Sequence, residues 1–494
     1  MRNQHERDFG QSVDWKLVIC YLVLIIIGWV NVYASIHSAE PASIFDLSYR
    51  CGKQTLWIIT GFILAAVILF AINPGFWQSV PIPLYLFVLA LLVAVIFFGI
   101  EVKGSRSWFE FGPVRFQPAE ISKISTSLML AMIMSRNNYK ITKPGNFLLT
   151  AIIIGLPMLV ILAESETGSA LVYVGFIFML YREGLSGWYI MMIGMAILLF
   201  ILTLIASPFT AVLVLIGVIW FCNITNYRNF IPNFLIEAAS ICFLAFIPHI
   251  WGQISEAAVP AAGAVISTAE RIAGSIKPVY LLIGIIVLCI PFLIYKAYKN
   301  RNSFILASIL SFLCGLALIF STEFIFNDIL QEHQRKRIEV LLGMKDDPTG
   351  VGYNVNQSMI AIGSGGLTGK GFLNGTQTSY GFVPEQSTDF IFCTIGEEWG
   401  FIGCAAVILL YIFMIWEIIS DAERSRDPFT RIYGYCVACC IFMHLFINIG
   451  MTIGLIPVIG IPLPFLSYGG SSLWSFTVLL FIFIALYREE KKYF

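Results

Sequence analysis

Repeated apolar runs, most of them close to 20 residues long, are the feature that most restricts how this sequence can fold. A helix of about 20 residues spans the hydrocarbon core of a bilayer, where no water is present to pair an open backbone group. Only 12% of the residues are charged and the mean hydropathy is +0.83, whereas a soluble domain carries about 25% charged residues. The sequence therefore predicts an all-α, polytopic membrane protein.

Fourteen membrane helices are predicted from these runs. They cover residues 16–35, 55–72, 83–100, 121–135, 147–163, 168–182, 186–206, 208–223, 232–249, 279–296, 303–323, 390–418, 430–455 and 471–487. Lysine and arginine collect in the short loops on one side, which places that side and both termini in the cytoplasm. These loops are 135–143, 181–184, 226–229, 296–302 and 422–431. The first span is too long for the apolar region of a cleavable signal, so no signal peptide is expected.

Four polar segments fall on the opposite side and are expected to converge there: 103–120, 164–169, 324–388 and 456–472. Convergent polar groups at one end of a helix bundle are typical of a binding site. The proline-containing segment 456–472 is predicted to be irregular or re-entrant. An interfacial amphipathic helix is expected at 250–278. The formal net charge of zero gives no indication of a nucleic-acid partner.

The longest polar segment contains the sequence GSGGLTGKG, residues 363–371. It does not match a nucleotide-binding P-loop, because Ser364 stands where the first glycine is needed and Gly371 where the hydroxyl residue is needed. The glycines either let backbone N–H groups approach phosphate oxygens or form a plain flexible loop.

A short surface helix is predicted just before this loop, because Asn354, Gln357, Ser358 and Ala361 share one helical face. That face is expected to look toward whatever the loop binds. Further upstream, the basic run 335–337 either is a solvated face near lipid headgroups or attracts an anionic lipid.

Two acids, Asp346 and Asp347, precede the predicted surface helix. Pro348 favours an extended backbone at Asp347. The Asp-Pro pair either starts a turn or ends the preceding helix so that the carboxylate points into a cleft. The residues alone leave both interpretations open.

Other carboxylates lie inside or beside apolar runs, where each costs at least ~2.5 kcal/mol on insertion scales unless it is paired or solvated. Glu397 and Glu398 are inside a predicted helix, and Glu385 and Asp389 lead into it. The remaining ones are Glu120, Glu164 and Glu166. Since Lys123 follows Glu120 by three residues on one helical face, the two either form a local ion pair or line a wet functional cavity.

The eleven cysteines lie mostly in apolar runs. Cys436, Cys439 and Cys440 include a C-x-x-C spacing, but neither a second cysteine pair nor a histidine cluster accompanies it in the sequence. They are predicted to be small packing residues rather than a metal or redox site.

Four stretches of the sequence resemble the SEDS family (shape, elongation, division and sporulation) of bacterial membrane proteins. They are KGSRSWFEFGPVRFQPAEISK, DDPTGVGYNVNQSMIAIGSGGLTGKGFLNGTQ, FVPEQSTDFIFCTIGEEWGFIG and NIGMTIGLIPVIGIPLPFLSYGGSS. The residues of these stretches are more similar to those of the elongation members than to those of the division members. The resemblance covers most of 16–206 and 324–490, and its most specific part is 343–471.

The resemblance also implies a domain organisation, since most members have about ten helices. Residues 207–322 are then a four-helix insertion between N-terminal core helices, 1–206, and a large external catalytic loop, 323–389. C-terminal core helices follow at 390–494. The family resides in the bacterial cytoplasmic membrane.

What the resemblance implies for function is a peptidoglycan glycosyltransferase that polymerises lipid II on the outer face of that membrane. The family's key acid lies immediately before Pro-x-Gly, and the matching residue is Asp347. Its carboxylate would take the proton of the acceptor 4-hydroxyl as that oxygen attacks the donor sugar. Attack opposite the leaving group inverts the anomeric centre and releases undecaprenyl pyrophosphate.

Substrate-binding residues are expected among the polar groups of the matching stretches. The candidates are Arg106, Glu120, Lys123, Gln357, Ser364, Lys370, Glu385, Asp389 and Glu398. Arg106, Lys123 and Lys370 are the cations expected to stabilise the departing pyrophosphate. The chain departs from the family pattern at two places, with Glu166 in a motif that usually carries Asp and Ser107 where many members have Arg.

The implied partners are lipid II, membrane lipids, a class B penicillin-binding protein and the elongation machinery. A divalent cation is compatible with a pyrophosphate, although no ligand cluster with definite spacing supports a metal site. The alternatives are a flippase for the lipid-linked precursor, a division-type polymerase and a scaffold. A flippase requires a polar path across the whole membrane, and the clustering of acids near one face favours the enzyme.

Overall fold

The computed structural model describes residues 13–36, 45–46, 48–102, 104–112, 114–224, 230–250, 278–300, 303–330, 332–342, 344 and 351–491. The chain forms two compact units, the first made of residues 1–187 and 345–494 and the second of residues 188–344. Both units are helical, as predicted. The predicted domain limits at 206, 322 and 389 stay predictions, and the helix expected at 250–278 lies almost wholly outside the described residues.

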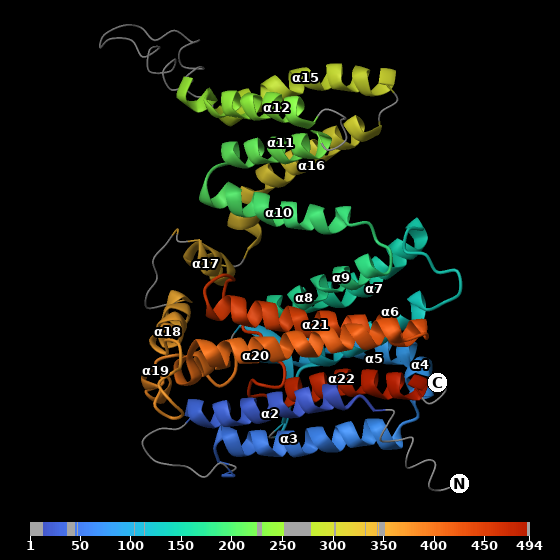
Figure 1. The fold of residues 1–494 in the computed structure, drawn as a ribbon, viewed down its shortest axis with the longest axis vertical. Coiled ribbons are helices and arrows are strands. Elements are labelled where there is room, and N and C mark those ends of the chain that lie inside the picture. The colour runs from blue at the N-terminus through green and yellow to red at the C-terminus, as the bar shows by residue number, and fades with distance from the viewer. Residues whose placement is uncertain are drawn as a thin grey trace. The chain divides into compact units, whose positions relative to one another are not determined.

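The first unit contains most of the helices and the strands (Figure 1). Its elements are α2 (Trp15–Ile36), α3 (Arg50–Ala66), the π-helix η1 (Val67–Ala71), α4 (Pro74–Ser79), α5 (Pro81–Phe98), β1 (Ile100–Val102), β2 (Ser105–Phe111), β3 (Val114–Phe116), α6 (Pro118–Met134), α7 (Pro144–Ala163), α8 (Thr167–Val174), α9 (Phe176–Arg182), α18 (Val351–Ser364), α19 (Thr376–Ser379), α20 (Ile391–Arg424), α21 (Pro428–Thr452) and α22 (Gly470–Lys491).

The second unit is a bundle of apolar helices followed by one short polar helix. Its elements are α10 (Trp188–Ile205), α11 (Pro208–Ile224), α12 (Phe230–Ala245), α15 (Pro278–Asn300), α16 (Ser303–Phe324), the π-helix η2 (Ile325–Ile329) and α17 (Glu332–Leu341). Its buried core consists of aliphatic and aromatic side chains of α10, α11, α15 and α16.

Each of the fourteen predicted spans coincides with a helix, although 168–182 is divided into α8 and α9 at Gly175. Among the described residues, ten helices are long and apolar enough to cross a membrane. The chain is therefore a multi-pass membrane protein. The exact count of fourteen crossings stays a prediction, because α6 has only 17 residues and three other apolar helices are shorter than 18.

The centre of the first unit is formed by α6, α21 and α22. In the most apolar stretch of α21 83% of the residues are buried, and in that of α22 78%, whereas only 22% are buried in α7. Figure 1 shows α20, α21 and α22, in orange and red, between the blue α2 and α3 on one side and α7, α8 and α9 on the other. Helices at the centre meet protein on all sides and can carry polar residues that lipid would exclude.

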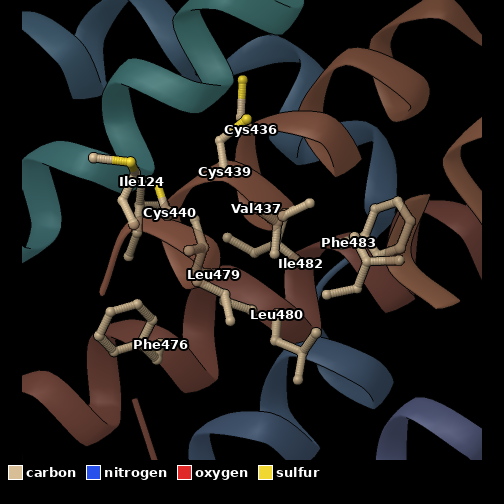
Figure 2. Close-up of a cluster of buried hydrophobic side chains, with 14 of the residues drawn as sticks. Ile124, Cys436, Val437, Cys439, Cys440, Phe476, Leu479, Leu480, Ile482 and Phe483 are labelled. Atoms are coloured by element: carbon tan, nitrogen blue, oxygen red, sulfur yellow. The ribbon is translucent and has the colours of Figure 1, made fainter. Parts of the chain in front are cut away.

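The cysteines of α21 belong to this core. Figure 2 shows Cys440 close to Leu479 of α22 and Ile124 of α6, with Cys436 and Cys439 in the same cluster, all of them buried. All eleven cysteines of the chain are free. The structure thus agrees with the prediction that these cysteines pack as small apolar residues.

A three-stranded antiparallel sheet, in the order β1-β2-β3, connects α5 to α6 and was not predicted from the sequence. Ile100 pairs with Trp108 and Phe109 with Phe116. Gly104 forms the first turn with a φ of 85°, a conformation that glycine adopts without steric cost. The strands have three to seven residues, too short to stand out as a pattern beside the long apolar runs.

Candidate functional site

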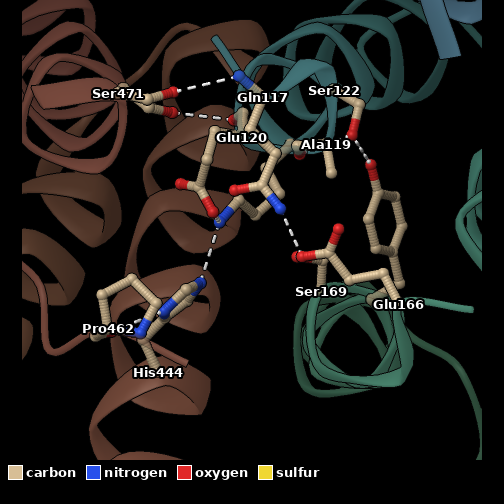
Figure 3. Close-up of polar contacts among 12 residues, drawn as sticks. Gln117, Ala119, Glu120, Ser122, Glu166, Ser169, His444, Pro462 and Ser471 are labelled. Carbon is tan, nitrogen blue, oxygen red and sulfur yellow. Dashed lines mark hydrogen bonds and ion pairs between the residues drawn. The ribbon is translucent and has the colours of Figure 1, made fainter. Parts of the chain in front are cut away.

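Buried polar side chains gather at the end of the first unit where α6, α8 and α22 begin (Figure 3). We call this group the α6 cluster; its members are Gln117, Glu120, Lys123, Glu166, Ser169 and His444. Pro118 starts α6, which suits the fixed φ of proline and an amide that needs no partner there. Glu120 and Lys123 follow within the first two turns and face the same side.

Lys123 is at the centre of the cluster and is only 1% exposed. Its Nζ lies 2.9 Å from Glu120 Oε1, so of the two alternatives the local ion pair is confirmed. The same Nζ lies 2.8 Å from His444 Nε2 and 4.9 Å from the ring centre of Phe476. A buried ammonium group is costly unless its donors are satisfied, and these neighbours satisfy it.

The sequence did not single out His444, which lies on α21, 321 residues after Lys123. Its Nδ1 is 3.0 Å from the carbonyl oxygen of Pro462. The sequence did contain a signal for it, because His444 is an ionisable residue within an apolar helix. Asn448, one turn later on the same face, strengthens that signal.

Glu166 joins α8 to α6, as Figure 3 shows. Its Oε1 accepts hydrogen bonds from the side-chain amide of Gln117 and, at 2.9 Å, from the hydroxyl of Ser169. Burial raises the pKa of Glu166, and a hydrogen bond from the buried Ser107 opposes the shift only in part. Burial, with a contribution from Glu166, also raises the pKa of Glu164 to about 9, so Glu164 is protonated at neutral pH.

A second polar group forms around Glu397, which is fully buried in α20. Lys370 Nζ lies 2.7 Å from Glu397 Oε1. The same carboxylate accepts the backbone N–H groups of Gln377 at 2.8 Å and Thr378 at 2.9 Å, which caps the start of α19. Of the predicted site residues, Lys370 is thus engaged with protein, and Glu398 accepts the N–H of Leu373 at 3.2 Å.

The glycine loop 363–371 closes a break in α20. Gly400, with a φ of 64° and a ψ of −160°, interrupts this helix and leaves backbone groups on both sides without helical partners. The N–H groups of Lys370 and Gly371 each donate at 3.0 Å to the carbonyls of Glu397 and Glu398. On the far side of the break, Gly366 O and Leu367 O accept N–H groups of α20 at 2.9 and 3.1 Å.

Gly365 and Gly369 are therefore needed for close backbone approach to α20, and the N–H groups of Lys370 and Gly371 are already paired with carbonyls. A Cβ on Gly369 would lie 2.1 Å from the carbonyl oxygen of Glu398, and its φ is 80°. Ser364, a predicted site residue, is exposed and donates its hydroxyl to the carbonyl of Ala361 at 2.8 Å.

Gly369→Ala is expected to lower the free energy of unfolding by ~2–4 kcal/mol, through a left-handed backbone strain and a clash that separates the loop from α20. Gly363→Ala is the matched control, because a Cβ there meets no described atom within 4 Å. Alanine in that helical position should be neutral or slightly stabilising. Thermal unfolding of both purified variants measures the difference, and equal stability would refute the docking role of Gly369.

The predicted surface helix is present as α18, but its orientation differs from the prediction. Ser358 and Ala361 are buried, and the Ser358 hydroxyl donates to the carbonyl of Thr452 at 2.9 Å. Met359 and Ile360 are exposed instead. Small polar residues suit contact with another backbone as well as with water. The predicted Gln357 is half-buried.

Glu385 and Asp389 lie where the end of the long polar segment meets α3 and α21. Arg50 Nη1 is 2.8 Å from the Ser387 hydroxyl and 3.7 Å from Glu385 Oε2. Asn448 donates its amide to the carbonyls of Asp389 at 2.8 Å and of Ile461 at 2.7 Å. Arg50 was not predicted, because nothing in the sequence relates it to residues more than 300 positions away.

Described parts of the four predicted polar segments meet in the first unit. Gln117 bonds to Glu166 and, at 3.5 Å, to Ser471, and the N–H of Tyr468 donates to the carbonyl of Ser387 at 2.8 Å. No helix forms between α21 and α22, at 453–469, in agreement with the predicted irregular segment.

Among the described residues, the predicted Arg106 is not part of these groups. Arg106, on β2, is 60% exposed and lies 3.7 Å from Glu101. Asp347, the predicted catalytic acid, lies outside the described residues together with Asp346.

One group of carboxylates has the spacing of a metal site. Oxygens of Asp14, Glu417 and Asp421 lie within 4.8 Å of one another, at the other end of the unit from the α6 cluster. Lys16 lies 2.6 Å from Glu417, and Arg424 and Lys491 lie 3.8 and 4.0 Å from Asp421 and Asp14. These three cations balance the carboxylates, so the group needs no metal ion for charge neutrality.

Comparison with known sequences places these features in a family. The sequence model of the family described as FtsW, RodA and SpoVE cell cycle proteins matches residues 14–233 and 267–492. It leaves residues 234–266 unmatched, and these lie inside the predicted insertion 207–322.

Relatives align over nearly the whole chain. The peptidoglycan glycosyltransferase MrdB of Escherichia coli (strain K12) is 29% identical over 476 residues, which cover 95% of this chain and 93% of the relative. The peptidoglycan glycosyltransferase RodA of Treponema pallidum (strain Nichols) is 28% identical, covering 94% of each chain. A probable peptidoglycan glycosyltransferase FtsW of Geobacter sp. (strain M18) is 25% identical, with 94% and 93% covered.

Solved structures share the fold. A chain described under "Structural coordination of polymerization and crosslinking by a peptidoglycan synthase complex" gives a TM-score of 0.57 at 19% identity, with 97% of this chain and 98% of that chain covered. A RodA structure from Thermus thermophilus gives 0.51 at 19% identity, with the same coverage. The chain therefore belongs to the FtsW/RodA/SpoVE family of cell cycle proteins and resembles its RodA members most.

Proposed function

We propose that this protein is a peptidoglycan glycosyltransferase that polymerises lipid II into glycan strands for cell elongation and shape. The observation that carries the proposal is the alignment with the E. coli glycosyltransferase MrdB, which covers 95% of this chain and 93% of the relative. The alignment includes all the elements that form the α6 cluster and the Glu397 group. The protein would act in the bacterial inner membrane, with both termini cytoplasmic and the site extracytoplasmic.

In the proposed reaction Asp347 accepts the proton of the acceptor 4-hydroxyl as this oxygen attacks the donor's anomeric carbon. The C–O bond to undecaprenyl pyrophosphate breaks with inversion, and negative charge grows on the leaving pyrophosphate. A cation held in a buried site stabilises such charge more strongly than one in water. Lys123 is buried and fixed by Glu120, which suits this role.

The other two predicted cations, Lys370 and Arg106, are more exposed than Lys123 and have different partners. The side chain of Lys370 is 27% exposed and paired with Glu397, so it would reach the pyrophosphate from the docked loop. Arg106 is on an exposed hairpin and would approach only a headgroup lying over the sheet. Gln357, Ser364, Glu385, Asp389 and Glu398 are retained as candidate contacts to sugar or peptide. A divalent cation on the pyrophosphate remains compatible with this scheme.

The partner we propose is a class B penicillin-binding protein that crosslinks the new strands. The support is the structural neighbour described as coordinating polymerization and crosslinking in a peptidoglycan synthase complex. The proposal includes the wider elongation machinery, because RodA-type relatives align over nearly the whole chain at 29% and 28% identity.

A lipid flippase is the competing function. In the described part of the first unit, buried charged groups lie near the two ends of the bundle, as with Lys123 near the start of α22 and Asp421 near its end. Such a distribution favours chemistry at one end over a charged path through the bilayer.

The decisive experiment incubates the purified protein with fluorescent lipid II, alone and with a class B penicillin-binding protein whose serine is inactivated. We expect a ladder of glycan strands on a gel, absent without the protein. A parallel vesicle assay follows transfer of the fluorescent lipid II between leaflets. Transfer without any ladder would replace the proposed function by the flippase.

A further inference from the structure

We propose that His444 is a positioning residue that holds the ammonium group of Lys123 in place for polymerisation. The inference rests on the proposed function for its effect on rate, and on contacts of the described residues for its physical basis. Nothing in the sequence pattern assigned His444 a role. Its place between Lys123 and the irregular segment 453–469 is the observation that carries the inference.

The hydrogen-bond chemistry fixes the state of the imidazole. The carbonyl oxygen of Pro462 can only accept, so the nitrogen 3.0 Å away, Nδ1, must carry the hydrogen. The ammonium of Lys123 can only donate, so Nε2, at 2.8 Å, must offer its lone pair. His444 is therefore a neutral acceptor for Lys123, oriented by a backbone carbonyl. Orienting a histidine through its second nitrogen is how proteins commonly set its tautomer.

Lys123 has three N–H donors, and the structure provides a neighbour for each. Glu120 Oε1 lies at 2.9 Å and His444 Nε2 at 2.8 Å, while the ring of Phe476 faces the ammonium at 4.9 Å. Phe476 also packs edge-on against His444, with 4.7 Å between ring centroids. Glu120 is on the same helix as Lys123, so among the described residues His444 alone ties the ammonium to a polar acceptor on another element.

The hydrogen bonds of His444 to Lys123 and Pro462 connect α6 to the proline-containing segment 453–469, which precedes α22. Pro462 belongs to this segment, and Asn448, one turn after His444, holds the adjacent Ile461 carbonyl at 2.7 Å. The hydroxyl of Tyr411 on α20 donates to the carbonyl of Pro464. Two helices, α20 and α21, thus fix the segment that orients His444, and the position of the Lys123 charge follows from it.

The test compares two substitutions at His444 by their effect on the polymerisation rate. His444→Gln can reproduce both contacts, since its amide N–H₂ can donate to Pro462 and its oxygen can accept from Lys123. It is expected to keep the kcat of the wild type within about threefold. His444→Leu offers no acceptor and is expected to lower kcat roughly tenfold or more with little change in KM, because the charge stabilised by Lys123 grows only as the bond breaks.

A control separates this effect from general damage to α21. Val437→Ala opens a cavity at a fully buried position of the same helix and should lower the Tm without lowering kcat. Equal kcat for the leucine, glutamine and wild-type proteins would overturn the inference. So would a glutamine variant as slow as the leucine variant, because the acceptor would then not be what matters.

Failure of the proposed function would be visible separately, as a wild-type protein that makes no strands. The positioning role is then read from thermal unfolding of His444→Leu, Lys123→Met and the double variant. We expect the double variant to lose no more Tm than Lys123→Met alone, because the contact is already gone. Additive losses would overturn the inference whatever the protein's activity.

Discussion

Asp347→Asn is expected to abolish lipid II polymerisation, with a loss of ~10²- to 10⁴-fold in rate. Asparagine has nearly the same size as aspartate but cannot accept the proton of the attacking 4-hydroxyl. The change should leave folding and membrane insertion unaffected, so the loss would fall on the chemical step. The measurement is the initial rate of glycan formation from purified lipid II, with thermal unfolding recorded for the same preparation.

Asp346→Asn is the matched control, since it removes the same charge one residue earlier. It is expected to retain most of the activity because the family's acid directly precedes the proline. If both variants polymerised at the wild-type rate, Asp347 would have to be given up as the base. If Asp346→Asn alone were inactive, the base would be assigned to the wrong member of the pair.

The second large effect is expected for Lys123→Met. Methionine fills a similar volume but leaves the buried Glu120 carboxylate without its cation, which costs ~3–5 kcal/mol in the free energy of unfolding. Polymerisation is expected to fall by about 100-fold or more, because in the proposed mechanism the Lys123 ammonium stabilises the charge on the leaving group. Both quantities are measured on the detergent-purified protein.

The double variant Glu120→Gln with Lys123→Met separates stability from chemistry. Removing both charges leaves no unpaired ion, so most of the lost stability should return. The activity should not return if the ammonium acts on the substrate. A double variant that regained polymerisation together with stability would show that the ion pair only supports the fold.

The parts of this protein that could be predicted from its sequence are those set by local periodicity and composition. Each of the fourteen apolar runs coincides with a helix, because the hydrocarbon core requires long apolar segments whose backbone groups are paired internally. The Glu120–Lys123 ion pair was one of two predicted alternatives, because residues three apart on a helix are neighbours. The irregular segment 453–469 followed from proline, which has no amide hydrogen to give.

Contacts between distant residues could not be predicted in the same way. Lys123 meets His444 and Arg50 meets Ser387 only because the helices pack in one particular arrangement, and a single sequence carries no record of that packing. The α18 helix gives a related lesson. Its periodicity fixed which residues share a face, but polar and small residues suit a neighbouring backbone as well as water. The face with Ser358 therefore turned inward.

The glycine break in α20 has a consequence for how the two parts of that helix can move. Residues 391–399 and 401–424 form two shorter helical segments joined at Gly400. The loop 363–371 bridges them through backbone hydrogen bonds to both segments. Lys370 adds its positive charge at the carboxyl end of the first segment, 391–399, where the helix dipole is negative. A change that drew Lys370 away would weaken this contact and allow the two helical segments to bend at Gly400.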